Sequence, residues 1–491
     1  MRILHTSDWH LGRTFHGRVL DDAHAVFADH LVELVRTEAV DAVVVSGDVY
    51  DRAIPPTDSV RLLDETLRRL SDLTRVILTP GNHDSARRLG FASDLLREGL
   101  TIRARIADVD RPVIVPGPDG GDGLYVYALP YLDPDAARET LPPLLADRLG
   151  EEPTDAARTT PEGAGGHSEK AAGDPPGTAS DAATRRLPRS HEAVVSGALR
   201  LVAADLAARR TAAPARVPAL VMSHAFVVGG LPSEESERDI RVGGVDSVPS
   251  GVFASLGGSP SARECGGLDY VALGHLHRPQ EIRSAGGAGR PNGPGKASGT
   301  GGPDHSSRSG GTGGPEAGES DGPGESGPPQ RDSRPGPRLV YSGSPLALSF
   351  SEAPFPKSSV LVALGPDGVA SLERVPAPVP HRIETVTGTM DELLSPAWDH
   401  AAGAWVRAVV RGPMPLGATS RLRERFGQVL AIVREEDEEA PRERIVVTRA
   451  ADPLEVSAQF LAEVAERAPS PAERAVLARA YEAVLASRGG E

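Results

Sequence analysis

The stretch Val43-Val44-Val45-Ser46-Gly47-Asp48-Val49-Tyr50-Asp51 decides the fold, because it has the pattern of a buried β-strand that ends at a glycine and presents a carboxylate. The three valines are β-branched and apolar, as a strand covered on both faces requires. Gly47 allows the backbone to leave the sheet in a tight turn. Ligands of open α/β sheets bind at the carboxyl ends of the strands, so we expect Asp48 at such an edge, where its two oxygens can bridge two metal ions.

The segments on either side of this stretch alternate between strands and helices. Strands are predicted over 2–6 and 75–79, and helices over 21–38 and 57–73, with Thr57 as the cap of the second helix. This order implies right-handed crossovers and a mainly parallel sheet. Further along, the sequence predicts a strand over 124–129, helices over 135–148 and 191–209, strands over 219–222 and 268–273, and a strand pair at 338–341 and 359–363.

The composition is that of a globular protein with several domains. The chain has 491 residues, which suggests about two to four domains, and its 39% hydrophobic content allows a sizeable core. No apolar run reaches membrane-spanning length, and the first residues lack the apolar segment of a signal peptide. Cys265 is the only cysteine, which excludes an internal disulfide framework and predicts a reducing, cytoplasmic location.

The balance of charges limits the possible partners. The net charge of −15 argues against broad, non-specific adhesion to nucleic acid. It leaves open DNA that is bound at a cationic metal site or with the help of a partner. The basic side chains are almost all arginines, and the only lysines are Lys170, Lys296 and Lys357. We interpret this bias as genome-wide codon usage rather than as function.

Two segments have the composition of insertions. Residues 150–188 are polar and rich in Gly, Pro and Thr, and we expect them to be disordered. Residues 286–337 are nearly all Gly, Pro, Ser and charged, and such a segment cannot bury enough apolar area to become ordered. The entropic cost of closing a loop grows slowly with its length, so we expect this linker to loop out without disturbing the sheet.

A second module begins near Pro378. Residues 380–450 are predicted to form a small α+β domain with a strand over 405–410, a helix over 418–426 and a strand over 429–433. Within it, Thr389 and Glu392 have the spacing of a capping box. Residues 452–488 are predicted to form two helices, each of which begins with a capping residue, a proline and an acid.

Polar side chains follow five of the predicted strands. They are Asp8 and His10, Asp48, Asn82 and His83, His224, and His275 and His277. Taken alone, each motif has an ordinary explanation, such as a polar surface loop, a turn or a hydrogen-bonded core histidine. Together they should converge on one edge of one sheet. If the strand ends stay extended, alternate residues point the same way, so Asp8 and His10 would face one ion, and the last two histidines would point inward likewise.

These residue types suit divalent cations. Mixed Asp, Asn and His ligands favour Mn²⁺, Fe²⁺ or Zn²⁺ over Ca²⁺. The set is large enough for two ions with Asp48 between them. Two-metal sites with ions ~3.5–4 Å apart stabilise both the attacking and the leaving oxygen in phosphoryl transfer. The residues therefore predict a dinuclear centre that acts on phosphate esters.

The motifs D-x-H, G-D-x-x-D, G-N-H-D, a lone His and G-H-x-H, in this order, resemble those of the calcineurin-like metallophosphoesterases. The longer strings at 5–12, 47–51, 223–226 and 341–345 resemble more narrowly the SbcD family, the nuclease subunits of bacterial SbcCD complexes. This resemblance implies an α/β fold of the four-layer, α+β sandwich type over 1–285 plus 338–378. It also implies that a small capping domain and C-terminal helices follow.

The resemblance implies a role for each residue of the motifs. One ion, expected to be Mn²⁺, would be held by Asp8, His10, Asp48 and His277. The second ion would be held by Asp48, Asn82, His224 and His275. His83 would not be a ligand but would stabilise charge on the phosphate or protonate the leaving oxygen. Asp84 would orient His83 through the other ring nitrogen, or it would have a purely structural role in the turn, and the role of Asp51 stays open.

The resemblance also implies partners. Residues 380–450 would be a DNA-capping domain, and the helices at 452–488 would dock on an SbcC-type coiled-coil ABC ATPase. The complex would be a heterotetramer that contains a homodimer of this chain, and no membrane would be involved. Arg13, Arg18 and Arg52 are candidates for contacts with DNA phosphates, with solvated surface charge as the alternative.

The function implied is a metal-dependent DNA nuclease in repair, replication and recombination. It would act as an ATP-dependent 3′–5′ exonuclease on duplex ends and as an endonuclease on hairpins and single strands. A metallophosphodiesterase for small molecules or cyclic nucleotides is an alternative, but such a substrate needs neither the second module nor the terminal helices. A mainly architectural, DNA-tethering subunit is another alternative, but a decayed site should have lost some of its ligands.

Overall fold

The computed structural model describes residues 1–150, 186–233, 247–262, 265–282 and 336–435, with a few more between 469 and 477. The predicted insertion at 150–188, the linker at 286–337 and the helix pair at 452–488 lie almost entirely outside these residues. Within the described part of the pair, the backbone N–H of Ser470 donates to the carboxylate of Glu473 (2.7 Å), and the N–H of Glu473 donates to the Ser470 hydroxyl (3.3 Å). This reciprocal pair is the pattern expected of a helix start.

Two six-stranded β-sheets form the centre of the first domain. The first sheet has the order β16 (Gly368–Pro376), β15 (Ser358–Gly365), β1 (Arg2–Thr6), β4 (Ala42–Ser46), β5 (Arg75–Thr79) and β6 (Leu100–Ile102). The second has the order β13 (Gln280–Ile282), β14 (Arg338–Tyr341), β12 (Tyr270–Gly274), β9 (Ala219–His224), β8 (Asp122–Ala128) and β7 (Val113–Pro116). Strands pair in parallel in the middle of both sheets, as predicted, and antiparallel pairing occurs toward the edges.

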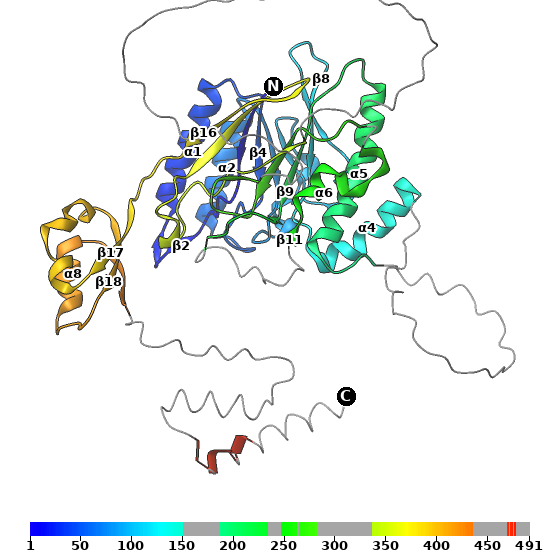
Figure 1. Cartoon of the computed structure of the whole chain (residues 1–491). Coiled ribbons are helices and arrows are strands. Elements are labelled where there is room, and N and C mark those ends of the chain that lie inside the picture. Colours follow the sequence, from blue (N-terminus) through cyan, green and yellow to red (C-terminus); the bar gives the residue numbers. More distant parts are fainter. Residues whose placement is uncertain are drawn as a thin grey trace, which may run out of the picture.

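Helices cover the outer face of each sheet (Figure 1). On the first sheet lie α1 (Asp21–Thr37) and α2 (Thr57–Ser71), and on the second lie α4 (Pro134–Leu149), α5 (His191–Ala212) and α6 (Ser250–Ala254). A separate apolar core fills the space between the two sheets. The four-layer α/β sandwich implied by the sequence is therefore confirmed. Among the helices in the described ranges, none has the length and apolarity needed to cross a bilayer.

Short elements complete the first domain. They are β2 (Thr14–Phe15), β3 (Arg18–Val19), β10 (Phe226–Val227), β11 (Ser247–Val248), α3 (Ala86–Leu89), η1 (Ser93–Leu95), η2 (Ile106–Asp108), η3 (Leu256–Gly258), η4 (Pro260–Ala262) and η5 (Phe350–Glu352). The prediction that Thr57 caps α2 was wrong, because Pro56 occupies the N-cap position and no side chain bonds the first turn.

The central strand β4 is covered on both faces, as predicted. Val43 and Val45 pack toward α1 and α2, and Val44 points into the core between the sheets. The expectation that all polar strand ends lie on one edge of one sheet was wrong. β1, β4 and β5 belong to the first sheet, whereas β9 and β12 belong to the second. The site is therefore assembled where the ends of two facing sheets meet.

The two strands predicted at 338–341 and 359–363 are present as β14 and β15, but the prediction that they form a pair was wrong. β14 pairs with β12 and β13 in the second sheet, and β15 pairs with β1 and β16 in the first. The two strands share no sheet because the chain crosses between the sheets over residues 342–357. This crossing segment carries polar residues that are important at the site.

The second module (residues 383–435) contains the strands and the helix predicted over 405–410, 418–426 and 429–433, but its strands are all parallel and alternate with helices, so it is an α/β unit rather than the α+β unit expected. Its parallel strands are β17 (Ile383–Gly388), β18 (Trp405–Val410) and β19 (Val429–Arg434), and its helices are α7 (Met390–Leu393), η6 (Pro396–Ala401) and α8 (Ala418–Phe426). The capping box of Thr389 and Glu392 is confirmed, with both of its hydrogen bonds present. The module has an apolar core of its own.

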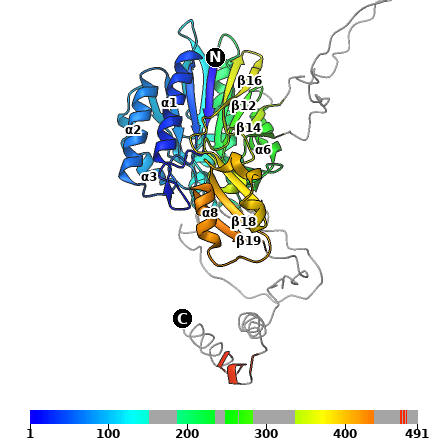
Figure 2. The same ribbon diagram turned by 90° about the vertical axis from the view of Figure 1, so that its left-hand side faces the viewer.

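The second module lies beyond the end of the sheets that is opposite the N-terminus (Figure 2). A cluster of aromatic and aliphatic side chains joins it to the first domain. In this cluster the ring of Trp405 stacks on Phe15, with centroids 5.7 Å apart, and on His381, with centroids 4.3 Å apart. His381 also bonds the carboxylate of Asp22 (2.9 Å). The module thus packs next to the strand ends that carry the polar motifs.

The two sheets approach each other closely at Gly274, the last residue of β12. A Cβ atom at this position would lie 1.9 Å from the backbone oxygen of Ser46 in β4 and 2.8 Å from Nδ1 of His224. Only a glycine therefore allows the ends of β4 and β12 to meet. Gly47 has a similar role, because it has a φ of +87° and a Cβ there would lie 2.3 Å from the His224 ring.

Replacing Gly274 with alanine should lower the free energy of unfolding by about 2 kcal/mol or more, because the added methyl group overlaps backbone that cannot move without displacing β4. Urea-induced unfolding, followed by circular dichroism, measures this change. The control is Gly251→Ala in α6, where a Cβ meets nothing within 4 Å. It should be neutral or stabilise by up to about 1 kcal/mol. Equal stability of Gly274→Ala and the unaltered protein would contradict the close approach.

Candidate metal centre

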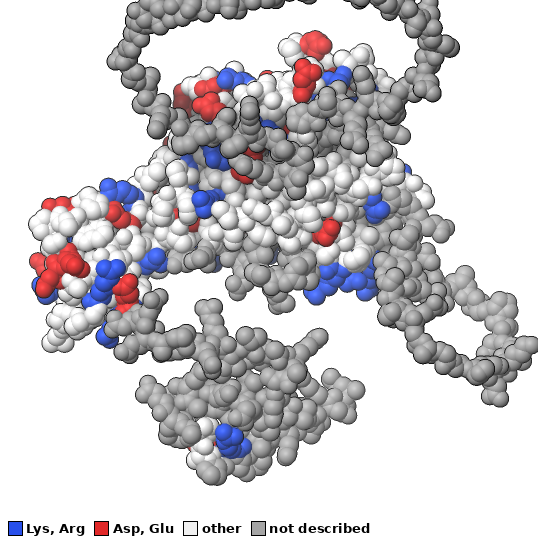
Figure 3. All heavy atoms as spheres, in the orientation of Figure 1, with Lys and Arg blue, Asp and Glu red and all other residues white. Residues whose placement is uncertain are grey.

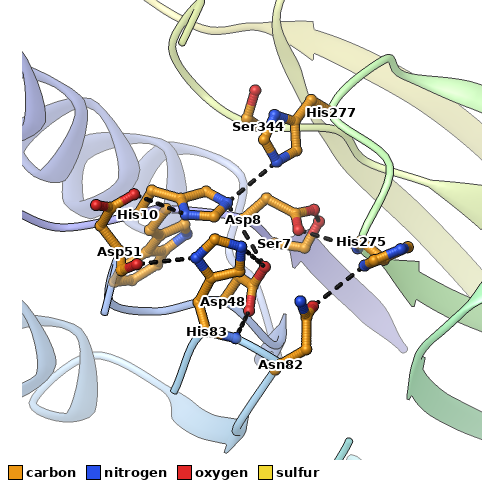
Figure 4. Close-up of polar contacts among 12 residues, drawn as sticks. Ser7, Asp8, His10, Asp48, Asp51, Asn82, His83, His275, His277 and Ser344 are labelled. Carbon is orange, nitrogen blue, oxygen red and sulfur yellow. Dashed lines mark hydrogen bonds and ion pairs between the residues drawn. The ribbon is translucent and has the colours of Figure 1, made fainter. Parts of the chain in front are cut away.

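Eight polar side chains meet where the two sheets end, and Figure 4 labels all of them except His224. The loops after β1, β4 and β5 and the ends of β9 and β12 contribute Asp8, His10, Asp48, Asn82, His83, His224, His275 and His277. Most of these side chains are almost completely buried. All seven ligands expected from the sequence lie in this cluster, and their role as ligands remains a prediction.

The first group of candidate ligands contains Asp8, His10 and His277. One ligand atom from each lies within 4.8 Å of the others. Nε2 of His10 is 3.1 Å from Nε2 of His277 and 3.6 Å from Oδ2 of Asp48. Two ligands at right angles around an ion with bonds of roughly 2.1 Å lie roughly 3 Å apart. The distance between the two histidine nitrogens therefore matches that of two ligands of one cation.

The second group contains Asn82, His224 and His275. Oδ1 of Asn82 is 2.9 Å from Nε2 of His224 and 3.2 Å from Nδ1 of His275. The backbone N–H of His275 also donates to a carboxylate oxygen of Asp8 (2.9 Å), so the two groups are tied together. An amide oxygen and two imidazoles are ligands for borderline divalent ions.

Asp48 lies between the two groups. Its Oδ2 is 3.6 Å from Nε2 of His10 and 3.3 Å from Nε2 of His224, and its Oδ1 accepts the backbone N–H of His83 (2.9 Å). The carboxylate is 2% exposed, so its charge needs compensation from inside the protein. The donor set of two carboxylates, one amide and four imidazoles fits divalent cations, with Asp48 available to both groups.

The backbone at these residues is not extended, contrary to the expectation from strand alternation. β1 ends at Thr6, and Asp8, His10 and Asp48 have φ values of +54°, +48° and +48°. The φ of His275 is +102°. Such conformations cost about 1–3 kcal/mol each in residues other than glycine, and they occur mainly where a functional site requires them. The side chains therefore converge by tight local turns rather than by alternation along a strand.

The charges of the site balance one another. Burial lowers the pKa of His10 to about 4, and burial and the nearby His224 hold the pKa of His275 well below its ordinary value. Burial also opposes charge on His224, but the carboxylates of Asp48 and Asp8 outweigh it and raise the pKa of His224 to about 9. Burial opposes ionisation of Asp48 as well, yet His224 and His10 hold the pKa of this carboxyl well below its usual range. The Asp48 carboxylate thus needs positive charge, which a proton on His224 or a divalent cation can supply.

His83 lies at the border of the two groups. Its ring is edge-on to that of His10, with centroids 4.8 Å apart. Nδ1 lies 2.8 Å from the backbone oxygen of Asp51, which can only accept, so Nδ1 carries the proton of this hydrogen bond. Nε2 lies 4.0 Å from Oδ2 of Asp48. The ring therefore directs Nε2 toward the metal centre.

The suggestion that Asp84 orients His83 was wrong. The carbonyl of Asp51 makes that hydrogen bond instead. The oxygens of Asp84 accept the backbone N–H groups of Val49, Tyr50 and Gly81 at distances of 2.8–3.0 Å. These contacts hold the turn after β4 against the turn after β5. They support the structural role that the sequence left as the alternative.

Asp51, whose role the sequence left open, contacts His10. Its Oδ1 is 3.5 Å from Nδ1 of His10 and 2.9 Å from a guanidinium nitrogen of Arg13. Burial opposes its ionisation, but the nearby His10 ring and the Arg13 guanidinium lower the pKa of the Asp51 carboxyl. Arg13 is thus engaged in an ion pair next to the site. Arg18 and Arg52 are exposed, and their contact with phosphate remains a prediction.

Sequence reasoning missed two charged residues behind His277. Glu352 and Lys357 lie on the crossing segment and are 0% and 6% exposed. Oε1 of Glu352 is 3.0 Å from Nδ1 of His277, and the Lys357 ammonium forms an ion pair with the same carboxylate. Burial opposes ionisation of Glu352, yet Lys357 and His277 hold its pKa well below its ordinary value. One signal was present in the sequence: Lys357 is the only lysine outside the two low-complexity segments.

Comparison with known proteins agrees with this geometry. A family model described as calcineurin-like phosphoesterase matches residues 1–153. Three curated relatives each carry the name of the SbcD component of the nuclease SbcCD. The relative from Bacillus subtilis is 30% identical over 377 residues, which are 76% of this chain and 69% of the relative. The relative from Rhodobacter capsulatus is 34% identical over 293 residues, which are 57% of this chain and 59% of the relative.

The third relative, from Staphylococcus saprophyticus, is 27% identical over 287 residues, which are 58% of each protein. The matched part of the chain therefore covers between 58% and 69% of the length of these relatives. The family model spans the loops after β1, β4 and β5, which carry Asp8, Asp48 and Asn82. A divalent-metal site at the sheet ends is thus supported by sequence family and by geometry together.

The affinity for Mn²⁺ should rise with pH between about pH 6 and pH 9. His224 has to lose a proton to bind an ion, and its pKa is raised to about 9. Below that pH the ion competes with the proton, so each unit of pH should raise the association constant by up to about tenfold, and the gain should stop above pH 9. Titration calorimetry in two buffers of different ionisation enthalpy should find about one proton released at neutral pH. Binding that is independent of pH, with no proton released, would contradict this prediction.

Proposed function

The chain belongs to the SbcD family of nuclease subunits, and on this premise we propose that it is the metal-dependent nuclease of an SbcCD-type complex. The reaction is hydrolysis of DNA phosphodiester bonds, in repair, replication and recombination. Duplex ends are degraded in the 3′–5′ direction while the partner hydrolyses ATP. Hairpins and single strands are cut internally. One observation carries the proposal: the buried carboxylate of Asp48 lies between two groups of candidate ligands, with His83 beside them.

We propose two Mn²⁺ ions as cofactors. The first group, Asp8, His10 and His277, would hold one ion and the second group, Asn82, His224 and His275, the other, with Asp48 shared. When bound, two divalent ions lower the pKa of water and offset the negative charge that develops on the phosphate. Four imidazole nitrogens among seven ligands favour a borderline ion such as Mn²⁺ over Ca²⁺ or Mg²⁺.

His83 is the proposed proton donor. Its Nδ1–H is held by the Asp51 carbonyl, so a second proton on the ring must sit on Nε2, which faces the centre. From there it can be given to the sugar oxygen that leaves the phosphorus. The carbonyl also fixes the plane of the ring, so the proton is delivered in one direction.

DNA is held mainly at this centre and by the partner. The net charge of −15 opposes a general attraction for nucleic acid, and Figure 3 shows acidic and basic side chains interspersed over the second module. Exposed Arg18 and Arg52 would contact phosphates near the site. Residues 380–450 would cap the DNA, since the module packs next to the strand ends that carry the ligands.

The partner is an SbcC-type coiled-coil ABC ATPase, on which residues 452–488 would dock. In the heterotetramer this chain would form a homodimer. Exposed apolar side chains support the contact between the two copies of this chain. Ile54, Phe91 and Leu95 are 68%, 82% and 84% exposed. A guanidinium nitrogen of Arg88 bonds the carbonyl of Ala53 (3.0 Å), which ties the two loops that carry them into one surface. Apolar side chains exposed together mark an interaction site.

His83→Gln should lower the rate of hairpin-DNA cleavage by about 10²–10⁴-fold, because the variant lacks the proton donor. Mn²⁺ binding and thermal stability should stay unchanged, because His83 is not one of the seven proposed ligands. The assay uses the full-length protein with Mn²⁺ on hairpin DNA, a cyclic nucleotide and a generic phosphodiester.

The matched control for this experiment is His30→Gln on α1, which should cleave at the unaltered rate. Undiminished cleavage by His83→Gln would remove this residue from the mechanism. Hydrolysis of the cyclic nucleotide without any cleavage of DNA would overturn the nuclease proposal.

Phe91→Asp combined with Leu95→Asp should convert a dimer into a monomer, because two buried charges would face each other across a two-fold interface. Size-exclusion chromatography with light scattering measures the mass. Leu416→Asp is the matched control, since Leu416 is fully exposed on the second module. An unchanged mass for the double variant would place the dimer contact elsewhere.

A further inference from the structure

The ring of His277 is held from both sides. Its Nε2 lies 3.1 Å from Nε2 of His10, and its Nδ1 lies 3.0 Å from Oε1 of Glu352. An ionised carboxylate only accepts hydrogen bonds, so Nδ1 carries the proton. This tautomer leaves the lone pair of Nε2 directed into the first group of candidate ligands. Glu352 therefore decides which nitrogen of His277 is available to an ion.

Lys357 holds the Glu352 carboxylate in place. An ammonium group has three N–H donors, and Lys357 has three acceptors: the carboxylate of Glu352, the hydroxyl of Ser344 at 2.9 Å and the backbone oxygen of His277 at 3.0 Å. Ser344 in turn donates to the carbonyl of Leu346 (2.9 Å). An ammonium group directs three donors from one nitrogen, which suits three acceptors gathered around a single point. Lys357 is the only lysine among the residues that the structure describes, where all the other Lys or Arg positions are arginines.

The same ammonium group thus fixes one histidine twice. It bonds the main chain of His277 directly, and it fixes the ring through Glu352. The backbone N–H of Leu348 also donates to Oε2 of Glu352 (3.2 Å), so the carboxylate has no freedom to turn away.

The segment that carries Glu352 is itself anchored between the two modules. Phe350, two residues before it, packs against Phe15 with centroids 5.0 Å apart, and the guanidinium of Arg407 in β18 lies 5.1 Å from its ring. Glu352 is therefore positioned by contacts with the second module as well as by the core of the first domain.

Stability alone does not account for this arrangement. A buried ion pair is often no more stable than apolar side chains of the same volume. Carboxylates that accept a hydrogen bond from a metal-binding histidine fix its tautomer and raise its basicity.

We propose that Glu352, held by Lys357, is a positioning residue that sets the tautomer and direction of His277 and thereby the affinity of the first metal group. This inference rests on the proposed two-metal site and goes beyond it by assigning the residues that prepare one ligand.

The test measures Mn²⁺ binding by the full-length protein with electron paramagnetic resonance of the free ion, in the absence of DNA. Glu352→Gln should weaken the binding of one Mn²⁺ by about 10–100-fold. Because a single change leaves Lys357 without its counterion, the double variant Glu352→Met with Lys357→Met is measured as well. It keeps a filled, uncharged core and should fold, yet it should show the same loss of affinity.

Asp269→Asn is the matched control. Asp269 is a buried carboxylate of the second sheet that accepts from Arg216 at 2.8 Å and from the backbone of Ala219 at 2.8 Å. This variant should lose thermal stability and keep the affinity for Mn²⁺, as a structural role requires. A folded double variant with unaltered affinity would overturn the proposal.

The Mn²⁺-binding test of Glu352 can be distinguished from a test of the proposed nuclease function. Protein that binds two Mn²⁺ ions but leaves DNA intact would overturn the nuclease and leave the role of Glu352 standing if its variants bind less tightly. Protein that binds no divalent ion would overturn both.

Discussion

The carboxylate of Asp48 is the point at which the two sheets are joined chemically. Its Oδ2 lies within 3.6 Å of His10, from the first sheet, and within 3.3 Å of His224, from the second. A buried negative charge is costly unless positive charge or hydrogen-bond donors surround it. The position of Asp48 follows from β4, whose valines are packed on both faces, and the approach of the second sheet follows from the missing side chain at Gly274. The remaining ligands are arranged around this one charge.

The loops that carry the ligands are strained but firmly tied. Asp8, His10 and Asp48 have left-handed backbone conformations, which cost free energy in folding. Hydrogen bonds between the loops hold them: the N–H of Asp8 donates to the oxygen of Gly47, and that of His10 to the oxygen of Asp48, both at 3.0 Å. Asp84 ties the same turn to the next one. The fold thus fixes the positions of these side chains, so they need to move little when metal ions bind.

The sequence by itself determined the elements and the membership of the site. Short apolar segments predicted β1, β4 and β5 within one residue of their ends, and the Thr389 capping box marked the start of α7. These features depend on neighbours along the chain, so local pattern is sufficient to predict them. The motifs also named all seven candidate ligands and His83, because each lies at or just after the carboxyl end of a predicted strand.

Only the tertiary structure decided which elements share a sheet and which side chains support the ligands. Sequence alternation placed the motifs on one edge, whereas the chain divides them between two sheets and crosses over at residues 342–357. That crossing brings Glu352 and Lys357 to His277, which is 75 and 80 positions away from them in the chain. Likewise the carbonyl of Asp51, rather than the adjacent Asp84, meets His83. Contacts of this kind depend on packing between distant segments, for which neighbouring residues carry no signal.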